Sequence, residues 1–341
     1  MGDDTSLAYQ ITREGGQVRG EWAHVPIADI GAGELLIRTS YSSVNYKDAL
    51  AATGAGKVVR SFPLIGGIDL AGEVAESADP RFRAGDQIVV TGFALGEEYD
   101  GGYSEWVRVS ADWAVPLPTG MSAWESMALG TAGLTVALAI HQLERSGLRP
   151  GQGPVAVTGA SGGAGSLAVS TLTARGYEVT AITGKADAHD YLRHLGAAEV
   201  AGRPDPGTAH GPLESARWAG AVDAVGGDTL SWLIRTTRRH GAIAAFGNAG
   251  GHQLNSSALP FILRGISLHG INTGYFHEEE LRRQLWQRMA TDLRPGHLDL
   301  IAHTIDFRQL PDQFPNLLEG RVRGRVVVRV NGHSQQGGDR S

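Results

Sequence analysis

The chain has 341 residues, of which 42% are hydrophobic and 19% charged, and its formal net charge is −6. This length predicts two folding domains, and the composition is that of a globular protein. The negative charge argues against binding to nucleic acid or to an anionic membrane, and the absence of cysteine excludes disulfides, thiolate nucleophiles and thiolate metal ligands.

The N-terminal part of the chain, residues 1–124, alternates short β-like runs with glycine and proline turns. The apolar runs include Leu35 to Thr39, Gln87 to Thr91 and Trp106 to Val109. This pattern predicts a rolled, mostly β domain. The first residues are acidic and contain no apolar signal core, and no later stretch has the length and composition of a membrane span. We therefore expect a cytoplasmic protein.

Residues 125–296 have a different pattern, in which strands alternate with helices after a helical stretch from Trp124 to Leu143. The predicted strands are Val155 to Thr158, Val179 to Thr183, Ala221 to Val225, Ala242 to Phe246 and Ile266 to His269. This alternation predicts an α/β fold with a doubly wound parallel sheet of the Rossmann type, whose strand ends line a ligand crevice.

After Pro295 the chain again becomes rich in strands. Residues 297–331, which include a predicted strand from Arg325 to Val330, are expected to rejoin the first domain. The last segment, residues 332–341, is polar and rich in glycine, which predicts a disordered tail.

A glycine-packed turn joins the predicted strand at Val155 to a helix. It reads Gly159-Ala160-Ser161-Gly162-Gly163-Ala164-Gly165. Such a turn lets the backbone approach a phosphate, which the N–H groups at the start of the helix then bind. The candidate cofactor contacts are Ser161, Gly162, Gly163, Ala164 and Gly165. The same residues also fit the G-x-S-x-G nucleophile elbow of serine hydrolases, with Asp223 and His252 or His269 as partners.

The end of the second strand decides between the two nicotinamide dinucleotides. NAD-selective domains place a carboxylate there, whereas this chain has Thr183-Gly184-Lys185, which favours a 2′-phosphate and hence NADPH. Arg203 follows the next short apolar run and is a further candidate for that phosphate. Gly247 and Asn248 follow the strand at Phe246, where an open backbone can reach the nicotinamide.

Several motifs together resemble the zinc-free quinone oxidoreductase branch of the medium-chain dehydrogenase/reductase superfamily. They are Ser42-Ser43-Val44-Asn45-Tyr46-Lys47-Asp48-Ala49-Leu50, Gly67-Ile68-Asp69-Leu70-Ala71-Gly72, Arg83-Ala84-Gly85-Asp86 and Gly130-Thr131-Ala132-Gly133-Leu134-Thr135. Asn45-Tyr46-Lys47-Asp48, Thr183-Gly184-Lys185 and Pro260-Phe261-Ile262-Leu263-Arg264 are similar to the acrylyl-CoA reductase subgroup.

This resemblance implies a Rossmann domain inserted into a GroES-like catalytic domain, a homodimer, and NADPH-dependent reduction of an activated carbon–carbon double bond. It adds Thr273 and Arg325 as cofactor neighbours. Asn45, Tyr46 and Asp69 are the expected catalytic residues: Tyr46 would flank the nicotinamide, Asn45 would bind ribose or substrate, and Asp69 would orient both.

The resemblance also bears on metal binding. Zinc-containing relatives have Gly-His-Glu where this chain has Gly67-Ile68-Asp69, and a cysteine-rich lobe that this chain lacks, so we expect no metal. The basic residues Lys57, Arg60, Arg81 and Arg83 could meet coenzyme A phosphates, although a solvated surface is the simpler interpretation.

The leading hypothesis is reduction of a small enoyl thioester, of the acrylyl-CoA to propionyl-CoA type. An NADPH quinone or enone oxidoreductase is the alternative. An NADPH-binding protein without turnover is a third hypothesis, because the sequence secures no proton donor and has Gly66 where the subgroup has proline. The serine hydrolase is a fourth, based on the G-x-S-x-G pattern.

Overall fold

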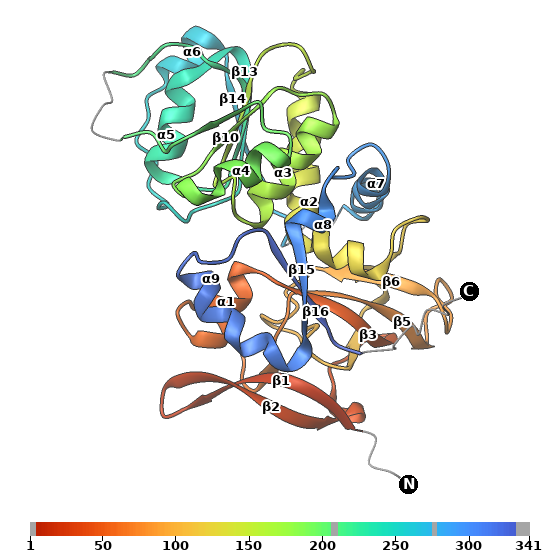
Figure 1. Ribbon diagram of the computed structural model, residues 1–341. Helices are drawn as coiled ribbons and strands as arrows, with labels where there is room; N and C mark the ends of the chain where they lie inside the picture. The colour runs from red at the N-terminus through yellow and green to blue at the C-terminus, as the bar shows by residue number, and fades with distance from the viewer. Residues whose placement is uncertain (1–4, 206–210, 275–277, 332–341) are drawn as a thin grey trace, which may run out of the picture.

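The chain forms two lobes that meet at a long helix, α2 (Ala123–Arg145) (Figure 1). The computed structural model describes residues 5–205, 211–274 and 278–331. The predicted tail at residues 332–341 lies outside this range. Both termini of the described chain belong to the lower lobe in this view, because β1 (Thr5–Glu14) and β16 (Arg325–Arg329) are strands of its two sheets.

The lower lobe is built on a seven-stranded sheet in the order β15-β16-β3-β5-β6-β8, with β7 paired to β3. Its strands are β3 (Leu35–Val44), β5 (Asp69–Ser77), β6 (Gln87–Thr91), β7 (Trp106–Val109), β8 (Val115–Pro116), β15 (Ala302–Asp306) and β16. Most neighbours are antiparallel, which agrees with the predicted GroES-like β domain. Two of these strands, β15 and β16, come from the C-terminal segment.

A second sheet lies at the base of the lower lobe, in the order β2-β1-β4. β2 (Gln17–Pro26) pairs with all ten residues of β1, and β4 is Leu64–Ile65. This long hairpin is absent from the sequence prediction. The other elements of this lobe are α1 (Tyr46–Thr53), α9 (Gln313–Leu318) and the short helices η1 (Ile27–Asp29), η2 (Ala111–Trp113) and η5 (Phe307–Asp312).

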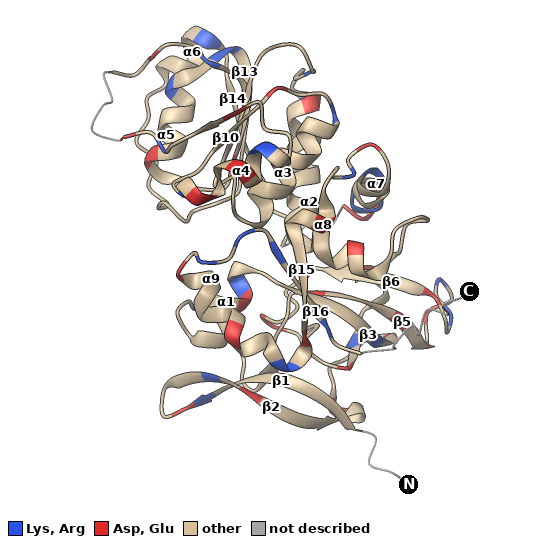
Figure 2. Ribbon diagram, viewed as in Figure 1, with Lys and Arg blue, Asp and Glu red and all other residues tan. Residues whose placement is uncertain are grey.

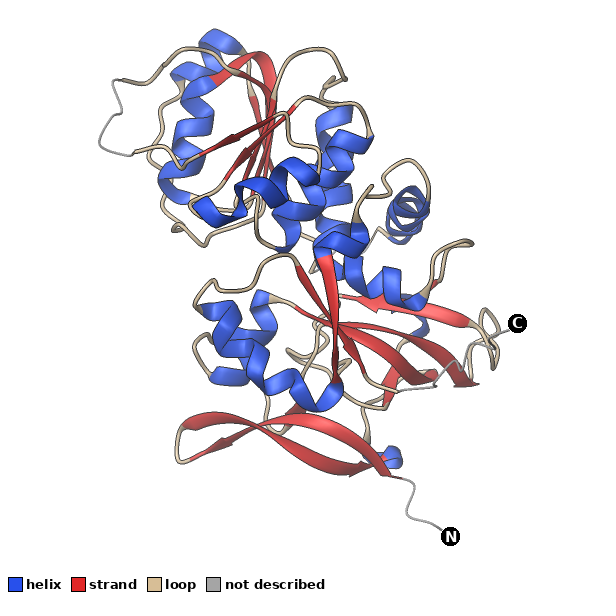
Figure 3. Ribbon diagram, viewed as in Figure 1, coloured by secondary structure: helices blue, strands red, loops and turns tan. Residues whose placement is uncertain are grey.

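The upper lobe is a six-stranded parallel sheet in the order β11-β10-β9-β12-β13-β14, with helices on both faces (Figure 3). Its strands are β9 (Val155–Thr158), β10 (Val179–Ile182), β11 (Glu199–Ala201), β12 (Trp218–Asp223), β13 (Thr237–Ala245) and β14 (Ser267–Gly270). Its helices are α3 (Gly163–Ala174), η3 (Ala186–Ala188), α4 (His189–His194), α5 (Gly227–Thr236), α6 (Leu259–Arg264), α7 (Glu279–Ala290) and α8 (Leu298–Ile301). The predicted Rossmann fold is confirmed.

Two predicted strands begin earlier than their apolar cores. β12 starts at Trp218 and β13 at Thr237, and their pairing shifts register between Trp218 and Gly220. The polar run Arg238-Arg239-His240 at the start of β13 hid that part of the strand from a prediction based on apolar residues.

Helix α2 lies between the lobes and is broken at Gly130, where φ is 53° and ψ is −154°. It is the one helix of the described chain that is long and apolar enough to span a membrane, and 67% of that stretch is buried inside the protein. Its apolar residues are therefore explained by the core, where α2 packs on β3, β5 and β13.

Candidate active site

The turn between β9 and α3 leaves backbone N–H groups open at the start of the helix. Gly162 is the N-cap residue of α3, and no side chain caps this end. A Cβ on Gly165 would lie 2.2 Å from the carbonyl oxygen of Gly159, so the helix can pack this closely on the turn only with glycine there. Uncapped N–H groups at a helix start bind anions. The predicted turn, Ser161 to Gly165, thus leads into an uncapped helix start; phosphate binding there stays a prediction.

The residues that follow β10 lie against the same turn. Ser161 Oγ is 3.0 Å from Thr183 Oγ1, and the backbone N–H of Lys185 donates to that hydroxyl at 3.1 Å. A Cβ on Gly184 would lie 3.0 Å from Arg203 Nε, so the guanidinium of Arg203 covers Gly184. The structure therefore brings these five predicted cofactor residues together, with no carboxylate among them.

The ammonium of Lys185 contacts the other lobe. It donates to the carbonyl oxygens of Gly320 and Val322, the second at 3.3 Å. A cavity of about 550 Å³ opens beside it, and Arg321 and Arg323 contribute to its lining. An anion bound here would compete with the two carbonyl oxygens for Lys185.

The carboxyl ends of β12 and β13 meet through glycine. A Cβ on Gly247 would lie 2.0 Å from the carbonyl oxygen of Ala224. Asp223, the last residue of β12, is fully buried and accepts a hydrogen bond from Thr158 Oγ1 at 2.5 Å. The next residue after Gly247, Asn248, is exposed. The residues predicted to approach the nicotinamide thus lie at the same sheet edge as the glycine turn.

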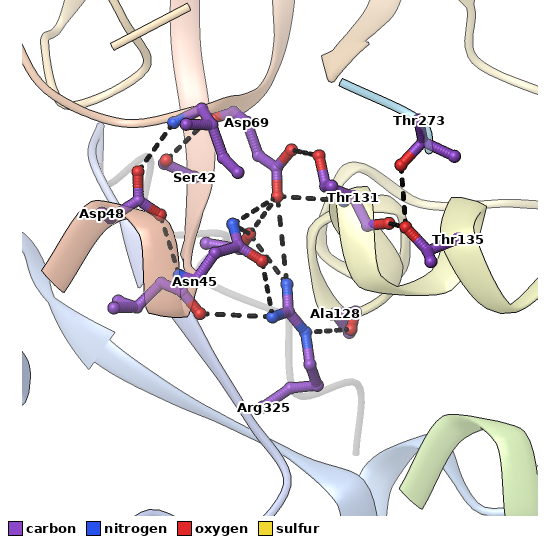
Figure 4. Close-up of polar contacts among 12 residues, drawn as sticks. Ser42, Asn45, Asp48, Asp69, Ala128, Thr131, Thr135, Thr273 and Arg325 are labelled. Carbon is purple, nitrogen blue, oxygen red and sulfur yellow. Dashed lines mark hydrogen bonds and ion pairs between the residues drawn. The ribbon is translucent and has the colours of Figure 1, made fainter. Parts of the chain in front are cut away.

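In the lower lobe, Asp69 lies fully buried at the boundary with α2 (Figure 4). Its carboxylate accepts hydrogen bonds from Ser43 Oγ at 2.6 Å and from Asn45 Nδ2 at 2.8 Å. Thr131 binds both carboxylate oxygens, through its N–H at 3.0 Å and its hydroxyl at 2.5 Å. Arg325 Nη2 lies 4.0 Å from the same carboxylate. We call these five residues the Asp69 cluster.

The break in α2 is shaped to admit this cluster. A Cβ on Gly130 would lie 2.6 Å from Asp69 Oδ2 and 2.8 Å from Arg325 Nη2. Because the second half of α2 starts at Thr131, the Asp69 carboxylate acts as its N-terminal cap. With no exposed surface and four hydrogen bonds to its carboxylate, Asp69 can act on a ligand only through its neighbours; its orienting role stays a prediction.

Arg325 spans from the Asp69 cluster to the glycine turn. Its N–H groups donate to the carbonyl oxygens of Ala128 (3.1 Å) and Val44 (3.2 Å), to Asn45 Oδ1 (3.0 Å) and to Ser43 Oγ (2.9 Å). A Cβ on Gly163 would lie 2.9 Å from Arg325 Cδ. Arg325 therefore packs against Gly163 of the turn through its Cδ, while its guanidinium bonds to residues of the cluster.

A second buried carboxyl group, Asp48, lies next to the cluster. It accepts hydrogen bonds from the backbone N–H groups of Asn45 at 2.8 Å and Ile68 at 3.0 Å. Burial, with the charge of Asp69 as the next cause, raises the pKa of Asp48 to about 7. Burial also raises the pKa of Tyr103 and lowers that of Arg325. Asp48 is thus a buried carboxyl group that changes charge near neutral pH.

Two other predicted residues lie on opposite sides of the lobe boundary. Tyr46, the first residue of α1, is 50% exposed. Thr273 follows β14 and is buried, with its hydroxyl 2.8 Å from Thr135 Oγ1 on α2 (Figure 4). The side chain of Thr273 is therefore occupied by α2.

Sequence reasoning missed Arg282, which joins the lobes from α7. Its guanidinium donates to the carbonyl oxygen (2.7 Å) and hydroxyl (3.2 Å) of Thr91 and to the carbonyl oxygen of Thr273 (3.3 Å), and it lies 4.2 Å from the ring centre of Phe93. Its spacing along α7 could have revealed it, because Arg282 lies on the same buried face of this amphipathic helix as Leu285, Trp286 and Met289.

Comparison with known proteins identifies the family. The family model "Alcohol dehydrogenase GroES-like domain" matches residues 31–119, and "Zinc-binding dehydrogenase" matches residues 163–291. The acrylyl-CoA reductase AcuI of Ruegeria pomeroyi is 43% identical over 96% of this chain and 99% of its own length. A Bacillus subtilis protein named as a quinone oxidoreductase, YhfP, is 43% identical over 95% of this chain and 98% of its own.

Solved structures of similar proteins have the same fold as this chain. The YhdH oxidoreductase of Salmonella enterica in complex with NADP superposes with a TM-score of 0.92 at 39% identity and covers 95% of this chain and 100% of its own. The B. subtilis YhfP structure with NAD bound gives 0.93 at 43% identity, covering 95% and 99%. The chain belongs to the medium-chain dehydrogenase/reductase family. Within it, the chain is an oxidoreductase of the branch that contains the quinone oxidoreductases and acrylyl-CoA reductases.

The serine hydrolase alternative does not fit this medium-chain reductase. Ser161 shares its hydrogen bond with Thr183, whereas His269 bonds Ser146 and His252 bonds Gln253. Asp223 is held by Thr158 and by backbone N–H groups. No Ser-His-Asp triad forms from these candidates, so the G-x-S-x-G interpretation is wrong.

Among the described residues, no three His, Asp or Glu side chains gather where they could hold a metal ion; zinc independence stays a prediction. Basic and acidic residues occur in both lobes (Figure 2). Of the basic residues considered for coenzyme A, Arg60 pairs with Glu98, Arg81 with Asp79 and Asp112, and Arg83 with Asp86, while Lys57 is exposed. Three of the four charges are thus balanced locally.

Proposed function

We propose that this chain catalyses the NADPH-dependent reduction of the carbon–carbon double bond of a small enoyl thioester, of the acrylyl-CoA to propionyl-CoA type. The name of the R. pomeroyi relative supports the substrate class, and the NADP complex of the S. enterica protein supports the cofactor. Bound NADPH would supply the hydride.

One observation carries the cofactor assignment: the residues after β10 place a hydroxyl and a guanidinium, and no carboxylate, beside the glycine turn. Thr183 Oγ1 lies 3.0 Å from Ser161 Oγ, and the Arg203 guanidinium covers Gly184. The Lys185 ammonium, which bonds to Gly320 and Val322, would turn to the phosphate when the cofactor binds. A 2′-phosphate needs such positive charge, whereas a ribose 2′-hydroxyl is normally bound by a carboxylate. Because the YhfP structure contains NAD, a preference of this chain for NADH over NADPH is the result that would contradict the assignment.

We assign the remaining site residues as follows. Ser161 to Gly165 would bind the pyrophosphate, and Gly247 and Asn248 would approach the nicotinamide. Tyr46 would flank the nicotinamide from the lower lobe. Asn45 would be held in place by Asp69 and Arg325. Thr273 and Arg325 would shape the cofactor site from behind, because the polar groups of their side chains are already bonded within the protein.

A quinone or enone oxidoreductase is the second candidate, favoured by the name of the B. subtilis relative. Steady-state NADPH oxidation with acryloyl-CoA, a small quinone and an uncharged enone separates the two. We expect the highest kcat/KM with acryloyl-CoA. A large preference for the quinone would reject the thioester assignment, and tight NADPH binding without oxidation of any substrate would favour a non-catalytic NADPH-binding protein.

We also propose a cytoplasmic homodimer. β14 is an edge strand of the upper sheet, with its outer side unpaired within the described chain. The adjacent helix α6 exposes apolar side chains: Leu259 (40%), Ile262 (71%) and Leu263 (51%). An exposed strand edge beside apolar surface favours pairing with a second copy, which can repeat the same contact across a two-fold axis.

A further inference from the structure

Reduction of an enoyl thioester needs a group that the site described so far does not provide. Hydride addition forms a C–H bond at the β carbon, and the π electrons of the double bond shift to give an enolate with its negative charge on the acyl oxygen. A proton from water then completes the α carbon. A donor held at that oxygen lowers the barrier to the first step. The inference below rests on the proposed function.

The Asp69 cluster cannot donate to this oxygen. The side-chain amide of Asn45 already donates to Asp69 Oδ2 at 2.8 Å and to Ser43 Oγ at 3.3 Å. Arg325 is 4% exposed, and its guanidinium donates to four acceptors inside the protein. The polar groups beside Tyr46 therefore bind one another and leave no cation for a substrate.

Lys47 is the next residue of α1, and its ammonium is differently placed. It donates to Glu97 Oε1 at 2.8 Å, and within the described chain it has no other hydrogen-bond partner. An ammonium has three donors, so two are left for a ligand. The Lys47 side chain is 41% exposed, whereas that of Glu97 is only 12% exposed, so the ion pair keeps its open side toward solvent.

The same ammonium reaches the upper lobe. A Cβ on Gly274 would lie 3.7 Å from Lys47 Nζ and 3.4 Å from Asn272 Oδ1. Gly274 follows Thr273 and accepts a hydrogen bond from the backbone N–H of Phe93 at 3.0 Å, which ties the Glu97 loop to this segment. Lys47 thus lies at the lobe boundary, beside Tyr46 along the chain and facing the segment that follows β14.

We propose that the Lys47 ammonium binds the acyl oxygen of the substrate and stabilises its charge as the enolate forms, with Glu97 as the positioning residue that holds the ammonium. Lys185 cannot take this role, since its ammonium bonds to Gly320 and Val322 beside the end of β10. The ligand class is the carbonyl group of an α,β-unsaturated thioester.

The test compares Lys47→Met, Lys47→Arg and Glu97→Gln with the wild type. Two substrates are used: acryloyl-CoA, and S-acryloyl-N-acetylcysteamine, which has the same thioester but no phosphates. We expect Lys47→Met to lower kcat about a hundredfold or more with both substrates, as loss of one preorganised donor does elsewhere. Lys47→Arg should retain more activity than Lys47→Met. Glu97→Gln should lower kcat by a smaller factor than Lys47→Met does.

Binding measurements complete the test. Calorimetry should give an unchanged Kd for NADPH in Lys47→Met. Arg19→Met, the control, removes an exposed charge on the β1–β2 hairpin and should match the wild type in kcat, KM and Kd. Three results overturn the proposal: an unchanged kcat, a defect confined to the KM for acryloyl-CoA, which would make Lys47 a phosphate ligand, or a weakened Kd for NADPH. A wild type that reduces quinones but neither thioester would instead reject the proposed function, and the Lys47 assignment with it.

Discussion

Thr131 gives both its N–H and its hydroxyl to the two carboxylate oxygens of Asp69, at 3.0 and 2.5 Å. A strand of the lower lobe thereby caps a helix that continues into the upper lobe. The contact needs the break at Gly130, because a continuous helix would satisfy the N–H of Thr131 internally. The Gly130-Thr131 motif thus has a physical role in joining the lobes.

The first prediction concerns Gly130→Ala. A Cβ there would overlap Asp69 Oδ2 at 2.6 Å, and its φ of 53° is unfavourable for alanine. The backbone strain alone is expected to cost about 1 to 3 kcal/mol, and the overlap adds to it. Urea unfolding measures the loss. Gly120→Ala is the matched control, since Gly120 also has a positive φ, +82°, but its Cβ would meet nothing within 4 Å. Equal losses in both variants would refute the packing argument.

A second prediction separates Tyr46 from Asp69. Asp69→Asn leaves Arg325 without its buried counter-charge, so we expect a loss of about 3 to 5 kcal/mol in the free energy of unfolding, together with a lower kcat. Tyr46→Phe removes an exposed hydroxyl and should leave stability unchanged while lowering kcat. Neither change should weaken NADPH binding as much as it lowers kcat. A normal kcat in Tyr46→Phe would limit that residue to packing.

The third prediction tests cofactor selectivity. Lys185→Ala and Arg203→Ala should each raise the KM for NADPH about ten- to a hundredfold while changing that for NADH little, because a charge-assisted hydrogen bond to a phosphate is lost. Arg193→Ala on α4, whose charge pairs with Asp190, serves as the control. If Lys185→Ala impairs both cofactors equally, its bonds to Gly320 and Val322 are its main contribution.

The fourth prediction follows from the raised pKa of Asp48. Because the folded protein holds this proton up to a pKa of about 7, whereas the unfolded chain releases it near the usual value for aspartate, the contribution of Asp48 to stability falls as pH rises between those values. The amide in Asp48→Asn does not titrate. The unfolding free energy of the wild type relative to that of Asp48→Asn should therefore fall from pH 5 to pH 7, by up to about 1.4 kcal/mol per pH unit. Urea titrations at several pH values measure it, and a constant difference would contradict the assignment.

The fifth prediction concerns assembly. Ile262→Glu places a charge on the apolar face of α6 beside the edge strand β14 and should shift the protein from dimer to monomer in sedimentation velocity. Leu300→Glu is the control, because Leu300 on α8 is also exposed, at 53%, but lies away from that edge. A dimer that survives Ile262→Glu, or a monomeric wild type, would reject the proposed interface.

The sequence predicted the parallel sheet well because its strands are short apolar runs separated by glycine and helical spacing. The β1–β2 hairpin escaped prediction since β2 alternates exposed and half-buried residues and contains no apolar run. β2 forms by pairing with β1 and packing on the lower lobe, and these contacts cannot be seen in the local sequence of β2. β11 was represented only by the apolar pair Val200-Ala201, within a strand of three residues.

The site was predicted unevenly for a related reason. The glycine turn and the end of β10 are local patterns, so the sequence placed them close together. Asp69, Asn45 and Arg325 were named, but the sequence could not show that their polar groups bind one another. Asp69 begins β5, Asn45 follows β3 and Arg325 begins β16, and these positions are far apart in the chain. Arg282 was not singled out, and Lys47 was quoted in a motif without a role of its own, since a basic residue on a helix is ordinarily solvated.

Arg325 contacts Gly163 of the dinucleotide turn with its methylene groups and the Asp69 cluster with its guanidinium. One side chain therefore belongs to both a ligand-binding turn and the buried charges of the opposite lobe. Thermodynamic linkage makes any such coupling reciprocal. If the intact cluster makes the free energy of ligand binding at the turn more favourable, bound ligand stabilises the intact cluster by the same free energy. A substitution in the cluster that weakens binding must, by the same amount, reduce the rise in unfolding free energy that the ligand produces.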